Sequence, residues 1–158
     1  MNVDGKDIRT IWLDKNEKVV KIIDQRRLPH EFVIVDLQTV DDTIAAIKDM
    51  YVRGAPLIGV TGAYGVYLAM LNAPDDQSEN DYLIQECNRI KASRPTAVNL
   101  AWAVDNVLAE TLKASDHHSK IAAAKNRAAA ISVQEVENCR KIDNNNCMIH
   151  NSLGDFLW

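Results

Sequence analysis

The chain has 158 residues, of which 47% are hydrophobic and 25% are charged, and its formal net charge is −4. This length suits one ordinary domain, or one small domain with part of another. The mildly acidic balance argues against a nucleic-acid-binding protein, which usually carries a basic face. The sequence contains no run of about eighteen apolar residues, so no membrane-spanning helix is predicted. Since the N-terminus has no signal-like segment, we expect a cytoplasmic protein.

Cysteine and histidine residues give no sign of a disulfide framework or a metal site. Cys87, Cys139 and Cys147 form an odd set without a C-x-x-C pair, so reduced thiols are expected. His117 and His118 are adjacent, and neighbouring helical residues point in different directions. Because no further ligand stands at metal-binding spacing, we predict no metal site and interpret both histidines as solvated.

The first part of the chain is predicted to form antiparallel strands. Residues 8–13 and 18–23 are rich in β-branched and aromatic side chains, and the short polar segment between them is typical of a hairpin turn. A third such run covers residues 31–37. We therefore expect a small antiparallel β-sheet within residues 1–38. The polar loop before the third run holds three basic residues for which a ligand role is the less favoured interpretation: Arg26, Arg27 and His30.

From residue 39 the apolar period changes to that of helices, and residues 39–142 are predicted to form a helical bundle. Thr39 and Asp42, three residues apart, resemble a capping box. A helix over residues 56–71 is apolar or small almost all round, so it should be the buried centre of the bundle. Another helix is expected over residues 79–92.

The junction Arg53-Gly54-Ala55, before the central helix, has the chemistry of an anion site. Pro56 suits a first helical position, and the first N–H groups of a helix are unpaired and carry partial positive charge. Gly54 permits close backbone approach, and Arg53 can add a bidentate donor. Phosphate is the expected ligand. The alternative is an ordinary corner between helices with Arg53 in solvent.

Three glycines, Gly59, Gly62 and Gly65, recur every third residue inside the central helix. Their small surfaces should let another element pack closely. They do not form a dinucleotide-binding loop, because such glycines stand between a strand and the start of a helix.

A second arginine–proline pair, Arg94-Pro95, repeats the arrangement of the junction. Pro95 is expected to start a helix that runs toward Lys113. Two arginines at two helix starts, Arg53 and Arg94, could converge on one anionic ligand. Taken alone, Arg94 is more often a surface residue than a ligand.

Three motifs together resemble a known enzyme family. They are Ile8-Arg9-Thr10-Ile11-Trp12, the run from Val52 to Gly59, and the run from Arg94 to Leu100. In this order they resemble the N-terminal part of the methylthioribose-1-phosphate isomerase family. Its superfamily also contains the regulatory subunits of the translation initiation factor 2B complex and ribose-1,5-bisphosphate isomerase. The resemblance covers about residues 5–142.

The resemblance implies an α+β fold, with a small N-terminal antiparallel β-sheet, a helical bundle, and the family's C-terminal Rossmann-like α/β domain absent. It implies that Arg53, Gly54 and Ala55 contact a sugar-phosphate substrate, that Arg94 joins them, and that no cofactor is used. The implied reaction is the aldose–ketose isomerisation of 5-methylthioribose 1-phosphate to 5-methylthioribulose 1-phosphate, in methionine salvage. Four residues could support the site or simply pack: Arg9, Trp12, Asp24 and Gln25.

The last residues, 143–158, are not recognised as family sequence. The catalytic cysteine and aspartate of the family lie in its second domain, so no catalytic residue is expected in this chain and it should be inactive alone. Cys147 lacks the context of a reactive thiol. Cys139, in a predicted helical stretch over residues 132–142, is interpreted as a packing residue.

Two other functions stay open. One is a non-catalytic interaction or regulatory protein of the initiation factor 2B type, with a partner chain bound on the face of Gly59, Gly62 and Gly65. The other is an enzyme like ribose-1,5-bisphosphate isomerase. Because a bundle without its second domain would expose apolar surface, we also expect a homo-oligomer, in which the N-terminal sheet or the glycine-rich helix is buried between copies.

Overall fold

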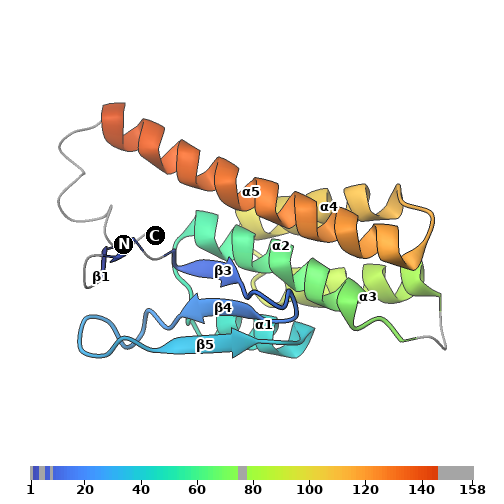
Figure 1. Ribbon diagram of the computed structural model, residues 1–158, viewed down its shortest axis with the longest axis horizontal. Coiled ribbons are helices and arrows are strands. Elements are labelled where there is room, and N and C mark those ends of the chain that lie inside the picture. The colour runs from blue at the N-terminus through green and yellow to red at the C-terminus, as the bar shows by residue number, and fades with distance from the viewer. Residues whose placement is uncertain (1, 4–5, 8, 75–77, 146–158) are drawn as a thin grey trace.

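A computed structural model describes residues 2–3, 6–7, 9–74 and 78–145. Within these residues the fold is α+β, as predicted, with antiparallel strands followed by five helices. Figure 1 shows the strands gathered on one side of the helices, with the long last helix running across the others. None of the described helices is both long enough and apolar enough to cross a membrane.

The main sheet is three-stranded and confirms the predicted hairpin and third strand, although each strand is shorter than its sequence run. It contains β3 (Ile11–Leu13), β4 (Val20–Ile23) and β5 (Ile34–Leu37), in that order and all antiparallel. A separate two-stranded ribbon pairs β1 (Asn2–Val3) with β2 (Lys6–Asp7).

Alternation along β4 explains which face of the main sheet packs inward. Val20 and Ile22 are fully buried, whereas Lys21 between them forms an ion pair of 2.6 Å with Asp36 of β5. Because successive strand residues point to opposite faces, Val20 and Ile22 lie on the face that packs inward, and Lys21 lies on the opposite face, which is covered at Ile23.

The bounds of the helices are α1 (Val40–Lys48), α2 (Ala55–Leu71), α3 (Glu79–Ala92), α4 (Val98–Leu112) and α5 (His117–Asn145). Helices α2 and α3 begin and end within one residue of the predicted positions, whereas α5 is much longer than the predicted helical stretch over residues 132–142. The capping box of Thr39 and Asp42 is formed at the start of α1, as predicted. The Thr39 side chain accepts from the Asp42 N–H, and the Asp42 side chain accepts from the Thr39 N–H, so two backbone donors of the helix start are satisfied.

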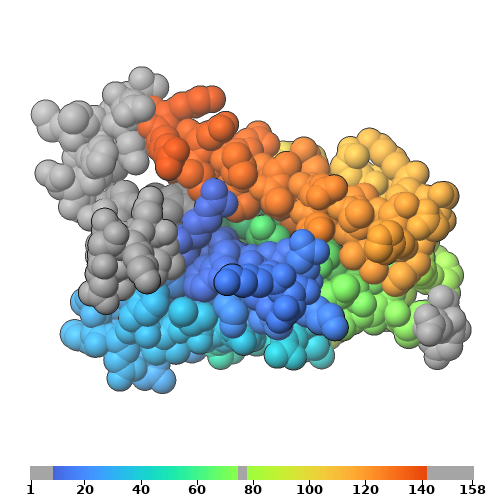
Figure 2. Space-filling model, viewed as in Figure 1, coloured from blue at the N-terminus to red at the C-terminus, as the bar shows by residue number. Residues whose placement is uncertain are grey.

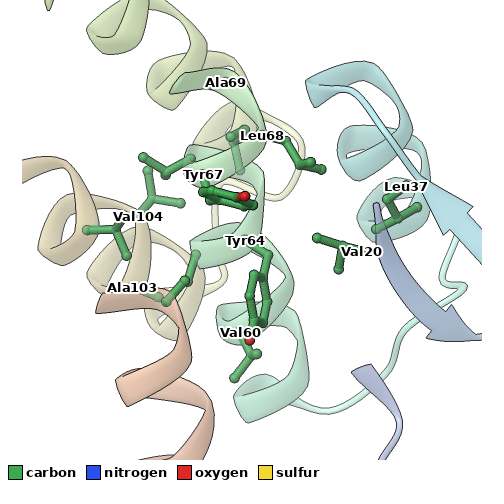
Figure 3. Packing of buried hydrophobic residues seen from close by; sticks show 14 of the residues in the cluster. Val20, Leu37, Val60, Tyr64, Tyr67, Leu68, Ala69, Ala103 and Val104 are labelled. Atoms are coloured by element: carbon green, nitrogen blue, oxygen red, sulfur yellow. The ribbon is translucent and has the colours of Figure 1, made fainter. Parts of the chain in front are cut away.

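Helix α2 is the buried centre of the fold, as its sequence predicts. Every residue from Leu57 to Met70 is buried. Figure 3 shows Tyr67 of α2 between Val20 of the sheet and Val104 of α4. A helix that is apolar on all sides is stable only when other elements surround it, and here the sheet and the other helices do so.

The three glycines of α2 face other helices of the same chain. A Cβ on Gly59 would meet Asn99 of α4, and one on Gly65 would meet Thr43 of α1. Close packing at the glycines is therefore confirmed. This glycine face is covered by α1, α3 and α4 of the same chain.

Helix α4 begins at Val98 and not at Pro95, which corrects the predicted helix start. The Ala97 N–H donates to the Arg94 carbonyl at 3.0 Å, so residues 94–97 form a turn. Proline suits the second position of such a turn as well as a first helical position, because both require its fixed φ. Arg94 thus lies in the turn between α3 and α4.

The hairpin turn between β3 and β4 is attached to two helices. The Tyr67 hydroxyl of α2 donates to the Glu17 carbonyl, and the Glu17 carboxylate lies 2.9 Å from Lys125 Nζ of α5. In Figure 2 the blue strands and the orange α5 meet over the centre of the molecule and leave little of α2 visible from this side.

Candidate functional site

The N-terminus of α2 is shaped by Gly54 as the sequence predicts, although the helix starts one residue earlier than expected. Gly54 is the N-cap with φ 89° and ψ 134°, and Ala55 is the first helical residue. The first intrahelical bond runs from the Ile58 N–H to the Gly54 carbonyl at 3.0 Å. No side chain caps this end, so the N–H groups of Ala55 and Leu57 remain as donors, while Pro56 has none.

The N-terminus of α4 lies beside the first turns of α2. A Cβ on Gly59 would stand 3.1 Å from the Asn99 carbonyl oxygen, and one on Gly62 would meet Leu100 and Val104 further along α4. Because the contacts advance together along both helices, α2 and α4 run in the same general direction. Their N-termini, and the positive ends of their dipoles, therefore lie at one end of the molecule. No side chain caps α4 either.

Arg53 and Arg94 flank the segment that leads into α2. The Arg53 side chain is exposed, and its backbone N–H donates to Gln25 Oε1 at 2.9 Å. The half-buried Arg94 places Nη1 2.7 Å from Sδ of Met50, three residues before Arg53. Met50 follows the C-cap of α1 and has a positive φ of 62°. The contact with Met50 places Arg94 beside the segment that ends at Arg53.

A third cation, Arg26, lies over the same segment. Its guanidinium stands 3.6 Å from the centroid of the Tyr51 ring and holds the buried Asp24 carboxylate through Nε at 2.9 Å and Nη2 at 2.7 Å. These bonds lower the pKa of Asp24 below its ordinary value, mainly through the Arg26 side chain. Sequence reasoning favoured a plain polar loop here and did not connect Arg26 with Tyr51, since only folding brings them together.

The other basic residues of that loop lie apart from the segment. Arg27 forms an exposed ion pair with Glu31 at 3.5 Å, and His30 is exposed. For these two residues the structure agrees with the loop interpretation. Arg9, named as possible support, is exposed, while Trp12 of β3 is half-buried.

The thiols and histidines lie away from this end of α2. Burial raises the pKa of Cys87 on α3 to about 12, and Cys139 is half-buried on α5. His117 Nδ1 lies against Glu79, and no group of three or more metal-ligating side chains is found in the described part of the chain. Cys147 lies outside the described residues.

Comparison with known proteins gives consistent matches. A model described as the initiation factor 2 subunit family matches residues 51–151, a range that ends inside the segment 143–158. Methylthioribose-1-phosphate isomerase of Desulfatibacillum aliphaticivorans is 54% identical over 143 residues, which cover 90% of this chain and 39% of that protein. The chain thus spans about two fifths of the length of such curated relatives.

Two solved structures share the fold. Translation initiation factor eIF-2B subunit delta from A. fulgidus superposes with a TM-score of 0.79 at 30% identity, over 85% of this chain and 39% of that one. 5-Methylthioribose 1-phosphate isomerase from Pyrococcus horikoshii gives a TM-score of 0.71 at 30% identity, over 82% and 37%. The same fold therefore occurs in proteins with two different names, and the fold alone does not choose between them.

Proposed function

The chain belongs to the initiation factor 2 subunit family, and we propose that it forms the phosphate-binding part of a methylthioribose-1-phosphate isomerase. One observation carries the proposal: two uncapped helix N-termini, those of α2 and α4, lie together beside Arg53 and Arg94. The 54% identity to a protein named as this isomerase supports the choice of substrate. We also propose that the protein is cytoplasmic.

Each residue of the site has a chemical role in holding a phosphate. The N–H groups of Ala55 and Leu57 donate to phosphate oxygens at the positive end of α2. Gly54, without a side chain, lets the ester approach the backbone. The guanidinium groups of Arg53 and Arg94 supply charge and paired donors, which suit a phosphate better than a lysine would.

Binding is expected without turnover when these 158 residues are assayed alone. Isomerisation of 5-methylthioribose 1-phosphate needs an acid–base pair to open the ring and move a hydrogen between C2 and C1. The resemblance assigns the catalytic cysteine and aspartate to the second part of the family's enzymes. Phosphate binding without a positioned acid and base gives little acceleration of the chemical step.

A second candidate is a regulatory protein of the initiation factor 2B type. The higher TM-score of 0.79, against 0.71 for the isomerase structure, is the observation that favours it. A regulatory protein of this type would not bind 5-methylthioribose 1-phosphate through Arg53 and Arg94. An enzyme like ribose-1,5-bisphosphate isomerase would instead prefer a ligand with two phosphates.

Self-association is a further part of the proposal. Val98 is 79% exposed and Trp102, one turn later on the same face of α4, is 43% exposed. Adjacent exposed apolar side chains favour contacts with another protein surface, and a homo-oligomer would cover them. Sedimentation at increasing concentration tests this, and a sharp monomer throughout would contradict it.

The decisive experiment is a thermal-shift titration with 5-methylthioribose 1-phosphate, read beside an assay for the ketose product. The ligand should raise the unfolding temperature of the wild-type chain. Arg53→Ala and Arg94→Ala should each weaken this effect. Lys113→Ala removes the same charge at the opposite end of α4 and should not change it. A stronger shift with ribose 1,5-bisphosphate would move the assignment to that substrate. Equal shifts in all four proteins, or no shift in any, would rule out the proposed site.

A further inference from the structure

Two hydrogen bonds of one residue, one through its backbone and one through its side chain, connect the end of the sheet to the segment that precedes α2. Gln25 stands two residues beyond the end of β4 and is 9% exposed. Its N–H donates to the Tyr51 carbonyl at 2.9 Å, and its Oε1 accepts from the Arg53 N–H at 2.9 Å. The two bonds lie on either side of Val52, which is fully buried. The path of the chain into Gly54 is therefore held by Gln25.

The neighbours of Gln25 hold the same segment from another side. Arg26 stacks on the Tyr51 ring, and the Asp24 carboxylate fixes the Arg26 guanidinium with two bonds. The backbone of Asp24 is held in turn by a hydrogen bond of 2.9 Å from its N–H to the Val33 carbonyl. Stacked and doubly bonded guanidinium groups have little freedom to move.

The bond to Gln25 decides which donors of the α2 N-terminus can face a ligand. The Arg53 N–H is engaged with Gln25 and points toward the sheet, so it is not available to an anion. Gly54 then turns the chain with its φ of 89°, and the first donors inside the helix belong to Ala55 and Leu57. The same bond fixes the backbone from which the exposed Arg53 side chain projects.

From this geometry we infer that Gln25 is a positioning residue of the anion site: through the Arg53 N–H it holds Arg53 and Gly54 in the conformation that binds a phosphate ester. The inference rests on the proposed function, since it concerns the same site. Gln25 itself does not touch the ligand. Its effect on binding passes through Arg53.

A double-mutant cycle tests this role, with 5-methylthioribose 1-phosphate as the probe. Gln25→Met keeps the length of the side chain and removes the acceptor for the Arg53 N–H. Affinity should fall about tenfold, the size expected when one positioned hydrogen bond is lost. In the Arg53→Ala background the N–H at position 53 and Gly54 remain, but the guanidinium that Gln25 positions is gone, so the same Gln25→Met change should weaken binding less.

A control separates positioning from general loss of stability. Tyr67→Phe removes the hydrogen bond to Glu17, which holds the hairpin turn at a different point of the sheet. It should lower the unfolding temperature without changing the affinity. Hydrogen exchange at the Arg53 amide adds a direct readout, since the exchange should be faster in Gln25→Met and unchanged in Tyr67→Phe.

The outcomes of this experiment are distinct. If the wild-type chain binds the ester and Gln25→Met binds it equally well, the positioning role is wrong while the proposed function stands. Equal effects of Gln25→Met with and without the Arg53 side chain would exclude positioning of the Arg53 guanidinium. If the wild-type chain does not bind, the proposed function fails and this inference fails with it. Should Gln25→Met not fold, Gln25→Asn, which is too short to reach Arg53, takes its place.

Discussion

Gly62 of α2 packs directly against Leu100 of α4, so closely that a methyl group on Gly62 would lie 2.3 Å from Leu100 Cδ1. Alanine usually stabilises a helix by about 1 kcal/mol relative to glycine. Here the added methyl must displace a fully buried leucine, and overpacking of this kind costs about 1–3 kcal/mol. Gly62→Ala should therefore lower the free energy of unfolding in a urea titration.

A second substitution tests whether the Leu100 contact causes the loss. Leu100→Val removes the atom that the new methyl would strike. By itself it should destabilise the chain by leaving a small cavity. Combined with Gly62→Ala, it should give a double variant that is more stable than the sum of the two single effects predicts. Simple additivity would contradict direct contact as the cause.

The ion pair between Asp24 and Arg26 predicts a pH dependence of stability. Bonds from Arg26 lower the pKa of Asp24 below its ordinary value of 3.8. A lowered carboxyl pKa stabilises the folded state above the ordinary value, and this contribution is lost as the pH falls through the lower, folded value. Asp24→Asn should therefore be less stable than wild type at neutral pH, and the difference should shrink below about pH 4.

Urea titrations at neutral pH and at about pH 3 measure this difference. Asp36→Asn is the matched control, because Asp36 forms an exposed pair with Lys21 and such pairs contribute little. A constant gap between Asp24→Asn and wild type across this pH range would mean that the charge of Asp24 is not the stabilising feature.

The Cys87 thiol should be unreactive in the folded chain. It is fully buried on α3, and burial raises its pKa to about 12, so almost no thiolate forms near neutral pH. Alkylation at about pH 8, followed by mass spectrometry of the peptides, should label Cys87 only after denaturant is added. Rapid labelling of Cys87 without denaturant would show that α3 opens in the folded state.

The features of the fold that were predicted correctly depend on residues close together in the sequence. Thr39 and Asp42 are three residues apart, and the capping box they predict is present. The proline signal at Pro95 predicted a helix start, but a turn also accepts proline, and the Ala97 N–H to Arg94 carbonyl bond shows a turn. The tie between Gln25 and Arg53 joins residues 28 positions apart, and nothing in either local pattern encodes it.

In the candidate site, too, the local motif was predictable and the tertiary contacts were not. The motif Arg53-Gly54-Ala55 pointed to the N-terminus of α2, and the structure has a glycine N-cap with positive φ there. Whether these residues bind phosphate stays a prediction. The place of Arg94 against Met50 and the stacking of Arg26 on Tyr51 depend on the tertiary fold alone. Contacts between residues far apart in the chain produce no periodic pattern in the sequence.

Gly54 should tolerate no other residue without loss of both stability and binding. Its φ of 89° with ψ 134° is a conformation that side chains with a Cβ rarely adopt, at a cost of about 1–3 kcal/mol. Asparagine, which accepts ordinary left-handed helical angles, should not rescue this position, because its favoured ψ is much lower. Gly54→Ala and Gly54→Asn should therefore both unfold at lower temperature.

The same substitutions should weaken phosphate-ester binding, since relief of the strain rotates the N–H groups at the start of α2 away from the ligand. Ala55→Gly is the neighbouring control: the exposed Ala55 has helical angles that glycine also adopts, at a cost of about 1 kcal/mol or less. Thermal unfolding and titration with 5-methylthioribose 1-phosphate measure both effects on the same samples. Full affinity in Gly54→Ala would show that the anion site does not depend on this turn, and the ligand would then have to be held by the arginine side chains alone.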